Sequence, residues 1–180
     1  MESRAPLRRA LTRRLEASRP DQRGDGASQP PRGKAVPLVV LGVGSELRGD
    51  DAAGIRVASA LARRRLRGVR CLAGGTAPEN LTAEIKRLSP SHLLIVDAAD
   101  MGRPAGSVAL IEPEEAGGTA FGTHAMPLSV LAGYLRRETG CRVTLIGIQP
   151  GSLELGAALS PEVGDAVEQT VALIAECLRA

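Results

Sequence analysis

Residues 36–66 decide the fold, and they read VPLVVLGVGSELRGDDAAGIRVASALARRRL. The segment begins with a short continuous aliphatic run, which is typical of a strand that is covered on both faces of a sheet. A turn rich in glycine and aspartate follows, and after it apolar residues such as Ile55, Val57 and Leu61 recur among alanines. Arginines gather at the end of this amphipathic stretch, where they complement a helix dipole. The segment therefore predicts a strand, a turn and a helix.

The same alternation continues along the chain. Strand-like aliphatic segments cover residues 69–76, 92–98, 106–113 and 142–150, and helix-like segments cover residues 78–88, 127–138 and 160–180. Strands that alternate with helices indicate an α/β domain with a mostly parallel sheet. The segment at 106–113 is reached without a long helix, which allows an antiparallel edge strand. We predict a three-layer α/β/α fold over residues 35–180, with a mostly parallel, five-stranded twisted sheet.

Residues 1–34 differ from the rest of the chain in composition. They hold nine of the 23 Lys and Arg residues but only four of the 20 acidic residues, so the basic character of the protein belongs to them. They are rich in Pro, Gly, Ser and Gln and offer little apolar surface to offset their ordering entropy. We expect a disordered basic tail here, with at most a transient helix over residues 5–17. The remaining residues carry no excess of positive charge, so nucleic acid is not an expected partner.

Composition also excludes several classes of protein. No apolar run approaches the roughly 20 residues that a membrane-spanning helix requires, and the N-terminus lacks the apolar core of a signal peptide. The three cysteines are scattered, which favours reduced thiols over a disulfide framework. We therefore expect a cytoplasmic protein without membrane contact. Its core must be aliphatic, because the chain has no Trp, one Tyr and one Phe.

Polar and small residues follow the predicted strands, at the edge where open parallel sheets bind their ligands. They are Asp50, Asp51, Gly74, Gly75, Thr76, Asp97, Asp100 and Gln149, joined by His124 from the loop before the helix at 127–138. Two carboxylates and an imidazole suit a borderline transition metal such as Ni, Zn or Fe. The residue types therefore make Asp51, Asp97 and His124 candidate metal ligands.

Other interpretations of these residues stay open. Nucleotide binding is not among them, because the turn lacks the third glycine of a dinucleotide-binding loop and its aspartates would repel a pyrophosphate. An acidic pair after the first strand also fits a magnesium-dependent phosphoryl-transfer site, although Gln149 stands where such sites need a lysine. Asp50 is expected to cap the following helix, and Asp97 could simply bind loop amides. His124 could be a surface residue, and His92 is expected to be structural because it stands at the opposite end of its strand.

Five segments together resemble the hydrogenase maturation endopeptidase family: VVLGVGSELRGDDAAG, GGTAPEN, LLIVDAADMGRPAG, THAMPLSVL and LIGIQP. The resemblance covers roughly residues 37–178 and is closest to the formate-hydrogenlyase (hydrogenase 3) type. It implies an endopeptidase that removes a C-terminal extension from the nickel-loaded precursor of the [NiFe]-hydrogenase large subunit, its expected partner. It also implies that Asp51, Asp97 and His124 contact the metal, with Asp51 and Asp97 as candidate catalytic residues. The precursor would supply the nickel, so the site is expected to be empty in the free protein.

Two positions depart from the family pattern. Ser45 replaces the usual Asn of the glycine turn, and Ala73 stands where the family usually carries an aspartate before the Gly-Gly pair. The missing acid leaves open a non-cleaving nickel-checkpoint or metallochaperone module that binds the same precursor. It is also open whether nickel acts as a Lewis acid or only marks a loaded substrate, and whether Asp51 or Asp97 accepts the proton of the attacking water.

Overall fold

The structure, a computed structural model, describes residues 4–17, 37–112, 120–121 and 126–179. The strands are β1 (Leu38–Val43), β2 (Val69–Gly75), β3 (His92–Asp100), β4 (Val108–Ile111), β5 (Ala120–Phe121) and β6 (Arg142–Ile148). The α-helices are α1 (Arg4–Glu16), α2 (Ala53–Arg63), α3 (Thr82–Leu88), α4 (Leu128–Thr139) and α5 (Pro161–Arg179). Two short 3-10 helices, η1 (Gly49–Ala52) and η2 (Pro78–Leu81), lead into α2 and α3. None of the helices in these ranges has an apolar stretch of the length that a membrane crossing requires.

The main sheet follows the order β2–β1–β3–β6–β4. β1 pairs in parallel with β2 and β3, and β3 pairs in parallel with β6. β4 is antiparallel to β6 and forms one edge, while the two-residue β5 pairs with the end of β3. The predicted mostly parallel, five-stranded sheet is therefore confirmed, and the segment at 106–113 does supply an antiparallel edge strand.

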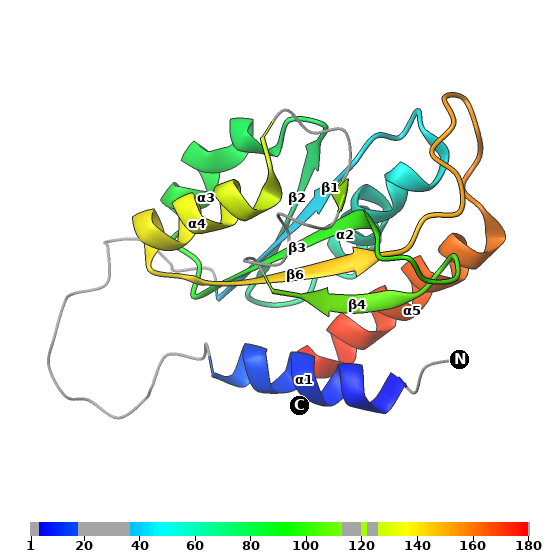
Figure 1. The fold of residues 1–180 in the computed structure, drawn as a ribbon. Coiled ribbons are helices and arrows are strands. Elements are labelled where there is room, and N and C mark those ends of the chain that lie inside the picture. The colour runs from blue at the N-terminus through cyan, green and yellow to red at the C-terminus, as the bar shows by residue number, and fades with distance from the viewer. Residues whose placement is uncertain (1–3, 18–36, 113–119, 122–125, 180) are drawn as a thin grey trace, which may run out of the picture.

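Helices cover both faces of this sheet, which gives the predicted three layers. α2 and α5 pack on one face, and α3 and α4 pack on the other (Figure 1). The side chains of β1 alternate between the two cores: Leu38 and Val40 belong to the core under α2 and α5, and Val39 and Leu41 to the other. A strand in this position needs apolar residues on both faces, which explains the continuous aliphatic run in the sequence.

The backbone of α2 lies very close to β1 and β3. A Cβ atom at Gly54 would overlap the carbonyl oxygens of Val43 and Val96, and one at Gly42 would overlap the carbonyl oxygen of Gly54. Residues without a side chain are therefore required on both sides of this contact. The contact holds the start of α2, and η1 before it, against the carboxyl ends of β1 and β3.

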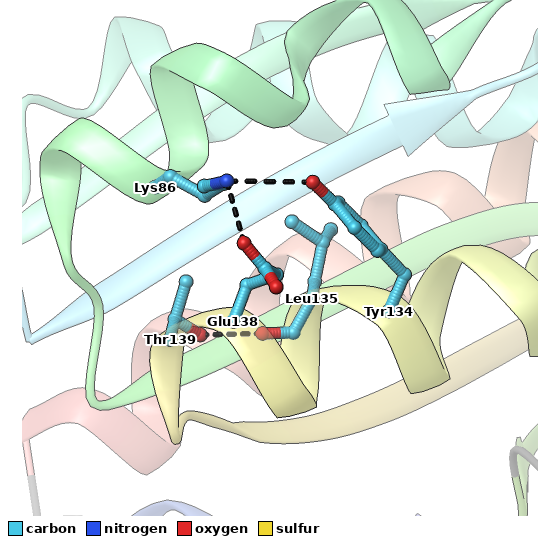
Figure 2. A network of polar contacts seen from close by, with 5 residues as sticks. All are labelled: Lys86, Tyr134, Leu135, Glu138 and Thr139. Carbon is cyan, nitrogen blue, oxygen red and sulfur yellow. Dashed lines mark hydrogen bonds and ion pairs between the residues drawn. The ribbon is translucent and has the colours of Figure 1, made fainter.

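A polar contact joins α3 to α4 on the other face (Figure 2). Lys86 Nζ lies 2.6 Å from Glu138 Oε2, 3.4 Å from Tyr134 Oη and 5.6 Å from the centroid of the Tyr134 ring. The hydrogen bond between Lys86 and Glu138 raises the pKa of the lysine and lowers the pKa of the glutamate. Because these groups are exposed, water and salt screen their attraction, and the apolar core contributes more to holding the layer.

Helix α1 corrects the expectation of a disordered tail over residues 1–34. Leu7, Leu11 and Leu15 recur every fourth residue and so share one face of the helix. Leu11 and Leu15 are buried and Leu7 is partly buried in the core that also contains residues of α5. The prediction weighed the polar composition of the whole segment and missed this narrow apolar stripe. Residues 18–34 of the expected tail lie outside the described residues.

Polar contacts add to the docking of α1. Thr12 Oγ1 donates a hydrogen bond to Cys177 Sγ in α5 at 3.3 Å, and Arg14 forms an ion pair with Glu112 after β4.

At the amino end of β3, His92 is buried with Nε2 2.9 Å from Thr144 Oγ1. Burial, followed by the nearby positive charge of Arg142, lowers the pKa of His92 to about 4, so the ring is neutral at pH 7. This position agrees with the structural role that we predict for His92.

The close approach of α2 should make Gly54→Ala strongly destabilising. The new methyl group meets backbone carbonyls that cannot move without shifting two strands, so the free energy of unfolding should fall by about 3 kcal/mol. Gly133→Ala is a matched control, because Gly133 also lies inside a helix but a Cβ atom there meets nothing within 4 Å. That change should raise stability by about 0.5–1 kcal/mol. Chemical denaturation measures both values, and equal losses would contradict the packing constraint.

The docking of α1 should depend on Leu11. Leu11→Ala removes buried methyl groups worth about 2–5 kcal/mol, and an isolated helix of this length is marginal in water. Amide hydrogen exchange across residues 4–16 should therefore accelerate, while the amides of β3 stay protected. Arg9→Ala changes an exposed residue of the same helix and should leave the exchange slow. Slow exchange in the Leu11 variant would show that the helix is held by other contacts.

Candidate functional site

The acidic residues singled out in the sequence lie where the strand order reverses. β2 lies on one side of β1 and β3 on the other, so the reversal falls between β1 and β3. Ligands of open α/β sheets bind beyond the carboxyl ends of the strands at such a point. η1 carries Asp50 and Asp51 between β1 and α2, and it contacts β3. The topology therefore brings Asp50, Asp51 and the end of β3 to one edge of the sheet.

Asp51 and Asp97 are both buried at this edge. Asp51 lies three residues before Gly54, whose backbone packs against Val96, and Asp97 directly follows Val96. The glycine contact therefore places the two acids on adjoining segments. Asp97 Oδ1 accepts a hydrogen bond from the N–H of Ala98 at 2.9 Å. Burial of ionised carboxylates is costly, so a pair of buried acids at a ligand-binding edge indicates a functional site.

Asp50 has a different role from the predicted one. The N-cap residues of η1 and α2 are Arg48 and Ala52, and Asp50 lies inside η1, so the predicted helix cap is wrong. The carboxylate of Asp50 instead accepts hydrogen bonds from the N–H groups of Gly151, Ser152 and Ser160 at 2.7, 3.0 and 2.7 Å. The hydroxyl of Ser160 donates a fourth, at 3.0 Å. Burial alone would raise the pKa of Asp50, but these hydrogen bonds outweigh it and hold the pKa below its ordinary value of 3.8.

Gln149 organises the loop that follows β3. Its Oε1 accepts hydrogen bonds from the N–H groups of Met101 and Arg103 at 2.6 and 3.3 Å. Its Nε2 donates to Asp100 Oδ1 at 3.1 Å, and this bond is the main cause that lowers the pKa of Asp100. The amide of Gln149 is thus used in loop structure. This arrangement gives no support to the phosphoryl-transfer interpretation, in which a lysine would stand at this strand end.

His124, the third predicted metal ligand, lies outside the described residues. Its approach to Asp51 and Asp97 therefore stays a prediction. Within residues 4–17, 37–112, 120–121 and 126–179, no group of three or more His, Cys, Asp or Glu side chains could hold a metal ion. Asp51 and Asp97 are the two predicted metal ligands that lie within the described residues, and their binding of a metal stays a prediction.

Glu79, which follows β2, is an acid that the sequence interpretation missed. Its Oε2 atom is buried and accepts no hydrogen bond from the part of the chain that the structure describes. The sequence analysis places Gly74, Gly75 and Thr76 at the ligand-binding edge, but it assigns residues 78–88 to a helix and gives Glu79 no role there. Ala73 and Thr76 on either side of the Gly-Gly pair are both exposed. A carboxylate is thus available after β2, although position 73 does not carry one.

The chain is similar to several characterised proteins. It matches the family model for hydrogenase maturation protease over residues 55–177. It is 38% identical over 131 residues to the hydrogenase 3 maturation protease of Escherichia coli (strain K12), which covers 72% of this chain and 83% of that protein. The crystal structure of the [NiFe] hydrogenase maturation protease HycI from Thermococcus kodakarensis KOD1 matches with a TM-score of 0.74 and 34% identity. That match covers 82% of this chain and 95% of the other. HybD of E. coli, a hydrogenase maturating endopeptidase, matches with a TM-score of 0.65 and 30% identity over 79% of this chain and 91% of the other.

Stability should depend on the charge of Asp50. Asp50→Asn keeps the shape but turns an NH₂ group toward N–H donors, so the free energy of unfolding should fall by about 2–4 kcal/mol near pH 7. The folded pKa of Asp50 lies below its unfolded value. The stabilisation is therefore present above the unfolded pKa and is lost as the pH falls through the folded pKa. Urea denaturation between about pH 7 and pH 2 should show the wild-type advantage shrinking with acidity.

Asp165→Asn is the control for this measurement, because Asp165 is an exposed acid on α5. It should leave the free energy of unfolding near the wild-type value throughout the pH range. A difference between wild type and Asp50→Asn that does not change with pH would contradict the role of the ionised carboxylate.

Proposed function

The chain belongs to the hydrogenase maturation protease family, and on that basis we propose that it removes a C-terminal extension from the nickel-loaded precursor of a [NiFe]-hydrogenase large subunit. The observation that supports this function most strongly is the pair of buried carboxylates, Asp51 and Asp97, at the reversal point of the sheet. Both lie on segments that the glycine contact of α2 holds together. Charged groups held in fixed positions in this way are typical of catalytic sites.

Nickel enters this proposal as part of the substrate. The precursor already holds the metal, and Asp51 and Asp97 would add oxygen ligands to it, with a nitrogen ligand from His124. This donor set suits a borderline divalent ion. The positive charge of the nickel ion would also interact favourably with the two buried carboxylates. A loaded precursor therefore binds more tightly than an empty one, and the site selects substrates that have received their metal.

Peptide hydrolysis needs an activated carbonyl group and a base for the attacking water. Nickel beside the scissile bond supplies Lewis acidity. An oxygen of Asp51 or Asp97 that does not bind the metal accepts a proton from the water as it attacks the carbonyl carbon. The same group returns the proton to the amine when the C–N bond breaks. The products are the shortened large subunit, with a new C-terminal carboxylate, and a free peptide.

The cysteines of the chain do not offer a competing nucleophile. Cys141 and Cys177 are buried, and Cys71 is partly buried on β2. Burial raises the pKa of the thiols of Cys71 and Cys141, which keeps them protonated near neutral pH. A protonated thiol is a poor nucleophile, so a covalent cysteine mechanism receives no support from this part of the protein.

Replacement of any one of the three proposed ligands should abolish nickel-dependent cleavage. Asp51→Asn, Asp97→Asn and His124→Ala should each reduce the rate by at least about a hundredfold, because each removes a ligand or the base. Asp100→Asn is the control, since Asp100 is an exposed acid at the same edge, and it should retain activity. The precursor is incubated with each variant, with and without bound nickel, and its mass is measured.

Two outcomes would contradict the proposal. A stable complex between the wild-type protein and the loaded precursor, without any change in mass, would favour the non-cleaving checkpoint module that Ala73 leaves open. Full activity in the His124→Ala protein would remove the imidazole from the metal site. Melting temperatures of all variants show whether a loss of activity reflects a loss of folding instead.

A further inference from the structure

Three large hydrophobic side chains are exposed within the described residues: Leu155 is 75% exposed, Leu47 71% and Val130 54%. A single exposed aliphatic residue is ordinary on a protein surface. Leu47 lies in the turn just before Asp50, and Leu155 lies in the segment after β6 that Asp50 binds. Val130 lies apart from them on α4. Two exposed leucines therefore border the candidate site.

Backbone hydrogen bonds join the two leucine-bearing segments directly. The N–H of Gly156, the residue after Leu155, donates to the carbonyl oxygen of Leu47 at 2.8 Å. The N–H of Asp50 donates to the carbonyl oxygen of Ser152 at 3.0 Å, and its carboxylate binds further N–H groups of the same segment. The two leucines thus belong to one surface whose backbone is held in place.

The fixed backbone of this surface lowers the entropy cost of binding a partner through the exposed leucines. Apolar side chains on a loose loop lose conformational freedom when a partner orders them, whereas side chains on a preorganised surface lose less. Covering an exposed leucine also removes apolar area from water, which favours association. Exposed apolar residues on an ordered surface beside a functional site therefore indicate a binding surface more strongly than the same residues elsewhere.

We propose that Leu47 and Leu155 form a docking surface for the folded body of the hydrogenase large-subunit precursor. This inference rests on the proposed function, because it takes the precursor as the partner. The acid pair is buried, so a protein substrate that reaches it must lie against the segments around it. Two of those segments carry the leucines, so a precursor that reaches the acid pair would cover these exposed aliphatic side chains.

The test uses the nickel-loaded precursor as the probe. Leu47→Ser and Leu155→Ser should each raise KM about tenfold, and the double variant should raise it about a hundredfold, while kcat stays unchanged. The melting temperature should not change, because both side chains are largely exposed in the free protein. Val130→Ser, the matched control, should keep the wild-type KM. Leu47→Met, which keeps an apolar side chain, should also stay near wild type.

Binding of the precursor without turnover, measured by surface plasmon resonance, separates this inference from the proposed function. If the wild-type protein binds but does not cleave, the protease proposal fails, and weaker binding by the double variant still supports the docking surface. Unchanged KM and binding in the double variant overturn the inference, as does an equal loss in Val130→Ser. If the free protein forms a dimer that depends on the two leucines, and the double variant still binds the precursor normally, the surface binds a second copy of this chain. That result also overturns the inference.

Discussion

The contact between the backbone of α2 and the sheet is the constraint on which the site depends. Gly42 and Gly54 leave no space for a side chain between the helix and the strands. Because η1 leads directly into α2, this contact also fixes where Asp50 and Asp51 stand relative to the ends of β1 and β3. Asp50 then binds the segment after β6, while Asp51 stays buried on a segment that adjoins the one carrying Asp97. Asp50 and Asp51 are thus adjacent in the sequence and are positioned by the same packing contact, but their surroundings differ.

The arrangement of strands and helices could be predicted because it follows from local patterns. The continuous aliphatic run of β1 indicates a strand covered on both faces, and Val39 and Val40 do enter opposite cores. The short connection before β4 allows the antiparallel edge that the structure contains. The edge at which Asp51 and Asp97 lie also follows from strand order, since every parallel strand ends on the same side.

The features that could not be predicted depend on residues distant in the sequence. Asp50 before a helix resembles a cap, and nothing near it reveals that its partners follow β6. Leu11 and Leu15 recur at helical spacing, yet a short helix is stable only against a partner surface, which here includes α5. The exposure of Leu47 and Leu155 likewise has no local signal, because similar leucines elsewhere in the chain are buried.

The partners of Asp50 lie 101 to 110 residues after it in the sequence. During synthesis on the ribosome, η1 therefore emerges well before the groups that bind its carboxylate, and domains fold as units once their parts are available. In a chain that stops before residue 151, Asp50 lacks these donors. The turn between β1 and α2 is then not joined to the segment after β6. Assembly of this edge is thus one of the last steps in making the molecule, and an unfinished chain lacks the surroundings in which a substrate would be cut.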